Sequence, residues 1–251
     1  MSKQNKNKEN AAFFRERAKE LRTLREILSK QFSGEQTNLD SLIVAAKDLE
    51  KKAEEGILLD TWGYTIKDLI LPLGDIRDVN PAGIQARVCL SCTCEFNVKD
   101  WNNTSCDPFN KFSFRLRIIG QLDDVVHSWG MHLDKETRSD LDEWHPMYHM
   151  HCFESRVDSP VVLIDSPKKK GSFLLNVPRF VHYPLDIFLG IGFCLMNFYK
   201  KDVFLNLYYN DQQFPRLYNK SEERILKPYF ASLANNPGSM LKQKLLCPQA
   251  V

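Results

Sequence analysis

The feature that most constrains the fold is an abrupt change in hydrophobic period along the chain. In residues 11–32 apolar side chains recur at steps of three and four, the period of an amphipathic helix. From Val88 to Val98 they alternate with polar side chains, which is typical of a strand with one buried face. The same alternation marks Phe112 to Ile118, Val125 to Leu133, Met147 to Val157, Val161 to Ile164 and Ser172 to Val177. Successive strands with short links predict an α+β protein with an antiparallel sheet or a partly open barrel.

The first 56 residues predict a helical hairpin. Ser33-Gly34 ends the first helix, and the second begins near Asn38 or Asp40 and ends at Gly56. Residues 1–10 are polar and rich in Lys and Asn, so we expect a disordered start. Two helices cannot bury both of their apolar faces alone. The hairpin should therefore pack on the body or dock to a protein partner.

The sequence thus divides into two predicted parts. Residues 1–56 form the hairpin arm, and residues 57–251 form an α+β domain with the sheet at about 84–177 and helices at about 184–235. A chain of 251 residues can bury a sizeable core without disulfides or metal.

Charge and cysteine content limit the function classes and the compartment. Residues 1–56 hold 12 basic and 10 acidic residues, which leaves 22 of each in the rest of the chain. This balance argues against a broad phosphate-binding face but leaves a local basic groove open. Seven cysteines and no apolar leader indicate reduced thiols and a cytoplasmic protein. The most apolar stretch, Leu185 to Tyr199, is too short for a membrane span, so no membrane contact is expected.

All six histidines lie within 56 consecutive residues, and they give the chain its one candidate site. On a strand His149 and His151 would share a face, with His145 in line if the strand begins that early. His132 and Asp134 of the preceding strand could add ligands. His182 and Asp186, where the last strand gives way to a helix, could approach the same face and support the site.

This pattern leaves several chemistries open. His149, His151, His132 and Asp134 could hold a divalent transition metal, and an open coordination position would suit hydrolysis by an activated water. Without metal, the same three histidines could act as catalytic acids or bases. The alternative is that the histidines are structural and satisfied within a half-buried strand. Whether the chain is an enzyme stays undecided.

Other signals favour structure over chemistry. Cys89-x-x-Cys92-x-Cys94 looks like a zinc half-site with Cys106 as a fourth ligand, but Cys92 and Cys94 occupy the apolar side of a strand, and core packing is favoured. Lys168-Lys169-Lys170 reads as a solvated hairpin tip. Arg115 and Arg117 share a strand face that could be a binding surface or a solvent-facing edge. Sequence motifs of nucleotide-hydrolysing motors, Rossmann dehydrogenases, α/β-hydrolases and zincin proteases are absent.

The order of motifs resembles a family of uncharacterised bacterial proteins encoded near mobile-element and phage-defence genes. The motifs are Trp129…His132-Leu133-Asp134, His145-Pro146…His149-Met150-His151, Pro178-Arg179…His182-Tyr183-Pro184-Leu185-Asp186, Leu189-Gly190-Ile191 and Asn197-Phe198-Tyr199. The resemblance covers roughly residues 110–230 and implies a cellular setting without assigning catalytic residues. Gly192 departs from the pattern by replacing an acidic residue, which puts a shared carboxylate chemistry in doubt.

Two functional hypotheses follow. The first is an accessory or effector protein of a bacterial anti-phage system, whose histidine-lined pocket binds or processes nucleic acid or a nucleotide. The second is a non-enzymatic interaction subunit with structural histidines, which docks to a protein partner through the helical hairpin.

Overall fold

A computed structural model describes residues 3–55, 61–73, 84–97, 107–123, 125–135, 147–153 and 180–234. The helices are α1 (Lys3–Gln31), α2 (Asp40–Glu55), α3 (Ile187–Phe198), α4 (Lys201–Asn210), α5 (Phe214–Ser221), a π-helical turn η2 (Glu222–Leu226) and α6 (Lys227–Ala234). The strands are β1 (Thr61–Leu73), β2 (Gln85–Asn97), β3 (Phe109–Leu122), β4 (Val125–Lys135), β5 (Tyr148–Phe153) and β6 (Phe180–Val181). The predicted α+β class with an N-terminal helical hairpin and C-terminal helices is confirmed.

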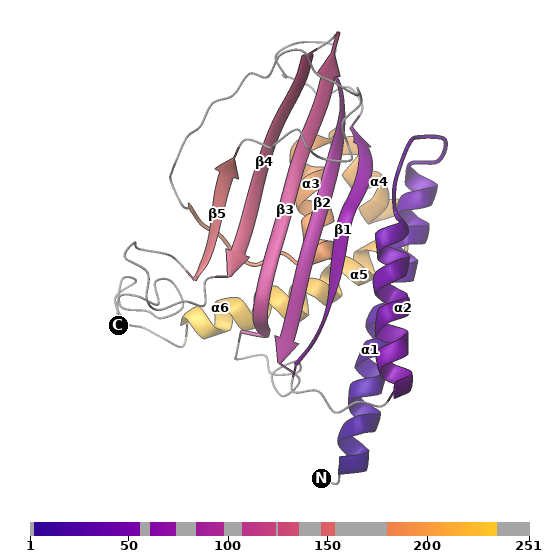
Figure 1. Ribbon diagram of the computed structural model, residues 1–251, viewed down its shortest axis with the longest axis vertical. Helices are drawn as coiled ribbons and strands as arrows, with labels where there is room; N and C mark the ends of the chain where they lie inside the picture. The colour runs from indigo at the N-terminus through magenta and orange to yellow at the C-terminus, as the bar shows by residue number, and fades with distance from the viewer. Residues whose placement is uncertain are drawn as a thin grey trace.

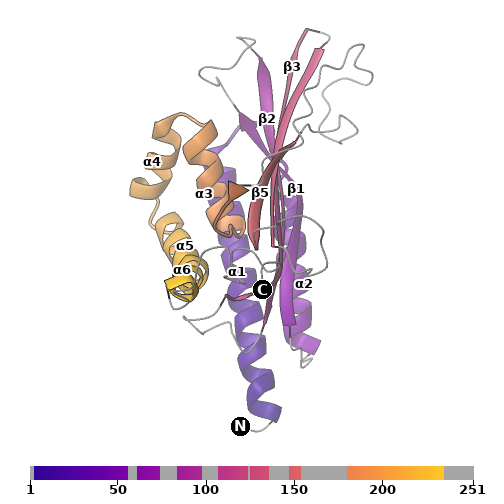
Figure 2. The same ribbon diagram turned by 90° about the vertical axis from the view of Figure 1, so that its left-hand side faces the viewer.

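The six strands form one open antiparallel sheet in the order β1-β2-β3-β4-β5-β6, so the sheet is a meander and not a barrel (Figure 1). Helices α3 to α6 lie together on one side of this sheet (Figure 2). The side that they cover is called the core face, and the opposite side is called the polar face. Strand alternation assigns each side chain to one of the two faces.

The core face carries the continuous apolar core. Phe96, Phe109 and Phe112 follow one another across β2 and β3 with ring centroids 4.9–5.0 Å apart. Helix α3 lies close to β3 because Gly190 faces Phe114: a Cβ at residue 190 would come within 2.2 Å of the Phe114 ring. A side chain at residue 192 would likewise meet the ring of Tyr218. Gly190 and Gly192 therefore allow α3 to approach both the sheet and α5.

The hairpin is part of this core. Phe14 of α1 packs on Trp62 of β1 at 5.6 Å, and the Arg17 guanidinium lies over the Phe188 ring of α3 at 4.8 Å. Glu16 and Glu20 of α1 form ion pairs with Arg224 of η2. The predicted apolar stripe of α1 is thus covered by the chain itself. Helix α1 begins at Lys3, within residues 1–10, for which the sequence predicts a disordered start.

Strand β1 escaped the sequence prediction because a bulge breaks its period. Buried side chains fall at Trp62, Tyr64 and Ile66, and then at Leu69 and every second residue to Leu73. The register shifts between Ile66 and Leu69, and Asp68 within the bulge has φ of 49°. The extra residue reverses the phase of the alternation, so the two-residue pattern does not run unbroken through the whole strand.

The other predicted elements agree with the structure to within a few residues, except in the C-terminal helices. Near the end of the helical region predicted at about 184–235, α5 is followed by the π-helical turn η2 and then by α6. The strands predicted at 161–164 and 172–177, and the tip at 168–170, lie outside the described residues. None of the described helices has an apolar stretch long enough to cross a membrane.

Candidate functional site

Two neighbouring rows of polar side chains cross the polar face from strand to strand, and together they are called the polar belt. The first row is Thr65, Thr93, Ser113, Asp134 and His149, and the second is Ser91, Arg115, His132 and His151. Within each row the residues are direct cross-strand partners, a separation at which side chains interact. The sheet register therefore collects residues that are up to 84 positions apart in the sequence, from Thr65 to His149.

The belt ends in three histidine rings that contact one another. His132 and His151 are cross-strand partners with ring centroids 4.7 Å apart and planes inclined by 33°. His149 meets His151 edge-on at 4.9 Å. Asp134 lies on the same side, and its Oδ2 is 3.4 Å from His132 Nε2. The structure thus brings together the four residues that the sequence proposed as the centre of the site.

The geometry of these four residues does not support the predicted metal centre. The rings of His132 and His151 are tilted by 33° with their centroids 4.7 Å apart, so the two rings pack against each other. His149 is only 4% exposed. In the described part of the chain, no group of three His, Cys, Asp or Glu side chains is arranged to hold a metal ion.

The supporting residues have separate places. His145 lies outside the described residues. His182 follows β6, where its Nδ1 lies 2.7 Å from the carbonyl oxygen of Tyr183 and its ring meets Phe193 of α3 edge-on at 5.9 Å. His127 lies on the core face, since it pairs with Gly120 in β3.

Asp186 was expected near the histidines, and the structure places it in the core instead. Its Oδ1 accepts hydrogen bonds from the backbone N–H groups of Phe188 and Leu189, so it caps α3. Its Oδ2 takes the Arg17 guanidinium at 3.2 Å and the Ser221 hydroxyl at 2.8 Å. With 0% exposure it joins α1, α3 and α5 and does not contribute to the polar belt.

Arg115 is the member of the belt that sequence reasoning did not connect with the histidines. Its side chain is exposed, and it makes no hydrogen bond or ion pair with the residues that the structure describes. It lies opposite Ser91 on one side and His132 on the other. Only the register of β3 against β4 reveals this position, because 17 residues separate Arg115 from His132 in the chain.

The charges around His132 favour its neutral form. Burial lowers the pKa of His132 below its ordinary value, and the positive charge of Arg115 lowers it further, whereas the Asp134 carboxylate raises it. An imidazole that is neutral near pH 7 can accept a proton at one nitrogen and donate one from the other. His132 is therefore able to act as a base or as a hydrogen-bond partner for a bound ligand.

Arg117, two residues along β3, is paired and differs from Arg115 in this respect. Its Nη2 donates to Asp68 Oδ1 at 2.7 Å and to Cys89 Sγ at 3.2 Å. Cys89 lies on the polar face, whereas Cys92 and Cys94 are buried on the core face with their sulfurs 3.4 Å apart. The three thiols therefore cannot converge on one zinc ion. Burial raises the pKa of Cys89 to about 11, so this thiol stays protonated.

Comparisons with family models, with curated proteins and with solved structures gave no match to this chain. Its function is therefore inferred from the chemistry of the polar belt.

Proposed function

We propose that this chain binds nucleic acid, or a nucleotide, through phosphate contacts on the polar belt, and that it acts as a cytoplasmic accessory or effector protein of a bacterial conflict system. The observation that carries the binding role is the row Ser91–Arg115–His132–His151. It sets an exposed guanidinium between a hydroxyl and two imidazoles. The cellular setting rests on the order of histidine motifs that resembles proteins encoded near phage-defence genes.

The belt has the chemistry that a phosphate requires. An arginine offers up to two parallel N–H donors to phosphate oxygens, and Ser and Thr hydroxyls add neutral donors. The carboxylate of Asp68 pairs with Arg117, so it does not neutralise the positive charge of Arg115. A protein whose overall charge is +2 can therefore still present a local cationic centre.

The dimensions of the belt suit a short single-stranded segment. Each row crosses from β1 or β2 to β5, and neighbouring strands are about 4.8 Å apart, so the longer row spans roughly 19 Å. Sheets of similar width hold about two or three bases in RNA-binding domains, where flat side chains stack on the bases. The rings of His132 and His151 could serve as such a stacking platform at the β5 end.

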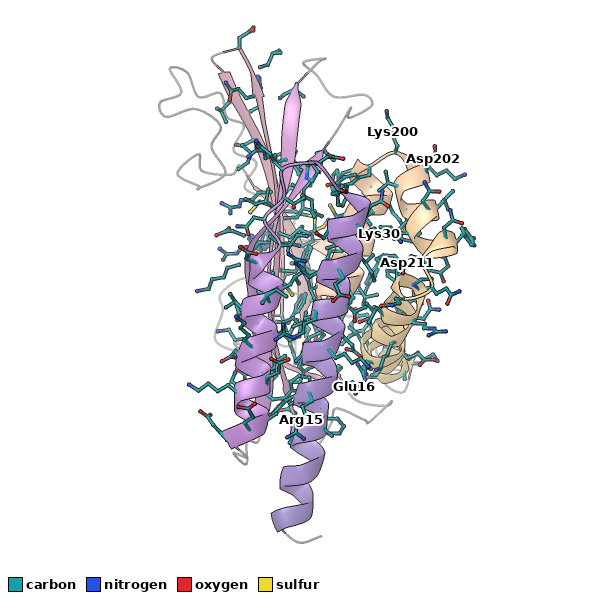
Figure 3. The ribbon with its side chains drawn as sticks, turned by 90° about the vertical axis from the view of Figure 1, so that its right-hand side faces the viewer. Arg15, Glu16, Lys30, Lys200, Asp202 and Asp211 are labelled. Carbon is teal, nitrogen blue, oxygen red and sulfur yellow. The ribbon has the colours of Figure 1, made fainter. Side chains whose placement is uncertain are left out.

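Fluorescence anisotropy with labelled single-stranded oligonucleotides tests the binding role. We expect Arg115→Ala to weaken binding about tenfold and to reduce the salt dependence by roughly one phosphate contact. Arg15→Ala is the matched control because Arg15 is an exposed arginine of α1 and is not part of the polar belt (Figure 3). An equal loss in both variants, or no binding by the wild-type chain at low salt, would contradict the proposal. Mononucleotides as competitors distinguish a nucleotide site from a nucleic-acid site.

The second candidate function is a non-enzymatic interaction subunit. Exposed apolar side chains favour it: Met196 of α3 and Phe230 of α6 are each 51% exposed, and Tyr183 lies beside Phe230. The apolar stripe of the helical hairpin, in contrast, is largely buried in the chain's own core. Full activity in cells of an Arg115→Ala/His132→Ala double variant would favour this second function over nucleic-acid binding.

A further inference from the structure

The β5 end of the polar belt contains more chemistry than binding requires. A carboxylate, two neighbouring imidazoles and a guanidinium lie within two adjacent cross-strand rows. Asp134 touches His132 at 3.4 Å, and the His132 ring centroid is 4.7 Å from that of His151. A histidine held by a carboxylate is the arrangement of an oriented base, and a second histidine beside it supplies an acid.

We propose that the polar belt cleaves single-stranded RNA by transphosphorylation, with His132 as the base, His151 as the acid and Arg115 as the phosphate ligand. This inference rests on the proposed nucleic-acid binding. It names RNA as the substrate class because the ribose 2′-hydroxyl provides a nucleophile next to the phosphorus. The imidazole pair then needs only to move protons.

The step balances within the enzyme–substrate complex. His132 takes the proton from the 2′-hydroxyl as O2′ forms a bond to phosphorus, and the bond from phosphorus to O5′ breaks as His151 gives its proton to O5′. The products are a 2′,3′-cyclic phosphate and a new 5′-hydroxyl end. Arg115, opposite His132 in the sheet, stabilises the charge that builds up on the non-bridging oxygens.

Neighbouring residues position these groups without touching the substrate. Asp134 Oδ2 lies 3.4 Å from Nε2 of His132, which favours proton transfer at the other ring nitrogen. His149 is almost fully buried and meets His151 edge-on, so it limits the rotation of the catalytic ring. Asp134→Asn should therefore lower kcat and alter the pH profile while leaving KM nearly unchanged.

The test compares three substrates with the full-length chain in the presence of a metal chelator. A labelled single-stranded RNA should be cut to products that end in 2′,3′-cyclic phosphate, whereas the same sequence as DNA or as 2′-O-methyl RNA should bind and stay intact. The cleavage rate should show a bell-shaped dependence on pH. RNA that binds without being cut would overturn this inference but leave the binding proposal standing. Absence of binding to all three substrates would overturn both proposals.

Variants prepared in parallel separate this activity from a contaminating nuclease and from misfolding. His132→Ala and His151→Ala should each lower the rate about 10²–10⁴-fold. His127→Ala should stay within about twofold of wild type, because His127 lies on the same strand β4 but on the core face. Equal rates in all of these proteins would overturn the assignment. The comparison between substrates does not depend on any variant, so the inference stays testable if one of them fails to fold.

Discussion

The two faces of the sheet each carry a cluster of charged residues, and the two clusters differ in how their charges are neutralised. On the core face Arg17 lies between Glu20 and Asp186, with exposures of 1%, 6% and 0%. On the polar face Arg115 is exposed and unpaired among the described residues, while the neighbouring carboxylate Asp134 contacts His132. The core cluster is closed within the chain, and the belt keeps a cation open to solvent.

This difference separates a structural role from a ligand-binding role. A buried charge must be paired inside the protein, because desolvation without a partner costs several kcal/mol. The residues of the core cluster therefore contribute to folding and are not accessible to a ligand. Arg115 costs little to keep exposed, and the proposed binding function gives a role to its position opposite His132. Variants on the two faces should accordingly change different observables.

The largest expected effect is on the core face. Asp186→Ala should lower the free energy of unfolding by about 3–5 kcal/mol, because it removes the partner of the buried Arg17 and the cap of α3. Urea denaturation followed by circular dichroism measures this change. Nucleic-acid binding by the fraction that stays folded should be unaffected.

A matched variant separates capping from ion pairing. Asp211 accepts hydrogen bonds from the N–H groups of Gln213 and Phe214 where α5 begins, but it has no buried arginine partner in the described structure (Figure 3). Asp211→Ala should therefore cost about 1 kcal/mol. A loss for Asp186→Ala no larger than this would show that the Arg17 ion pair adds nothing to stability.

The second-largest expected effect is a loss of stability from altered packing, and it should again differ between the two faces of the sheet. In Gly190→Ala the new methyl group would come within 2.2 Å of the Phe114 ring, so we expect a loss of about 1–3 kcal/mol in spite of the better helix propensity of alanine. Ser113→Ala, on the polar face of β3 beside Phe114, should stay within about 0.5 kcal/mol of wild type. A neutral Gly190→Ala in thermal melts would mean that α3 can move away from the sheet freely.

The sequence predicted the fold class well because the hydrophobic period is a local property. Strand β2 and helix α3 are found from their own residues, since alternation or a long apolar run marks each of them. Strand β1 was missed because Asp68 adds a residue that reverses its alternation. The sequence left open whether the hairpin packs on the body or on a partner, and it could not reveal the ion pairs of Glu16 and Glu20 with Arg224, which join positions 204–208 residues apart.

The candidate site shows the same limit more sharply. Strand period alone was sufficient to place His149 beside His151. The cross-strand pairing of His132 with Arg115 and His151 depends on the register of the sheet, which cannot be predicted from a local sequence pattern. Asp186 was assigned to the site because it follows His182 closely in the chain. Its carboxylate instead accepts hydrogen bonds from the first turn of α3 and from Arg17, which lies 169 residues away in the chain.

The smallest expected effect is a dependence of stability on pH that comes from two half-buried histidines. Burial lowers the pKa of both His132 and His182 below the ordinary value of 6.5. Below pH 6.5 the unfolded chain takes up protons that the folded chain resists, so the free energy of unfolding should fall as pH decreases from 7.5 to 5.5. We expect each ring to contribute less than ~1 kcal/mol, because both keep contact with solvent. The lowered pKa of Glu20 affects stability only below pH 4.5, which is outside this window.

Urea midpoints of His132→Gln and His182→Gln at the two pH values should show a flatter dependence on pH than wild type. A slope that survives both substitutions would place the titrating group elsewhere and would weaken the view that His132 is neutral in the polar belt.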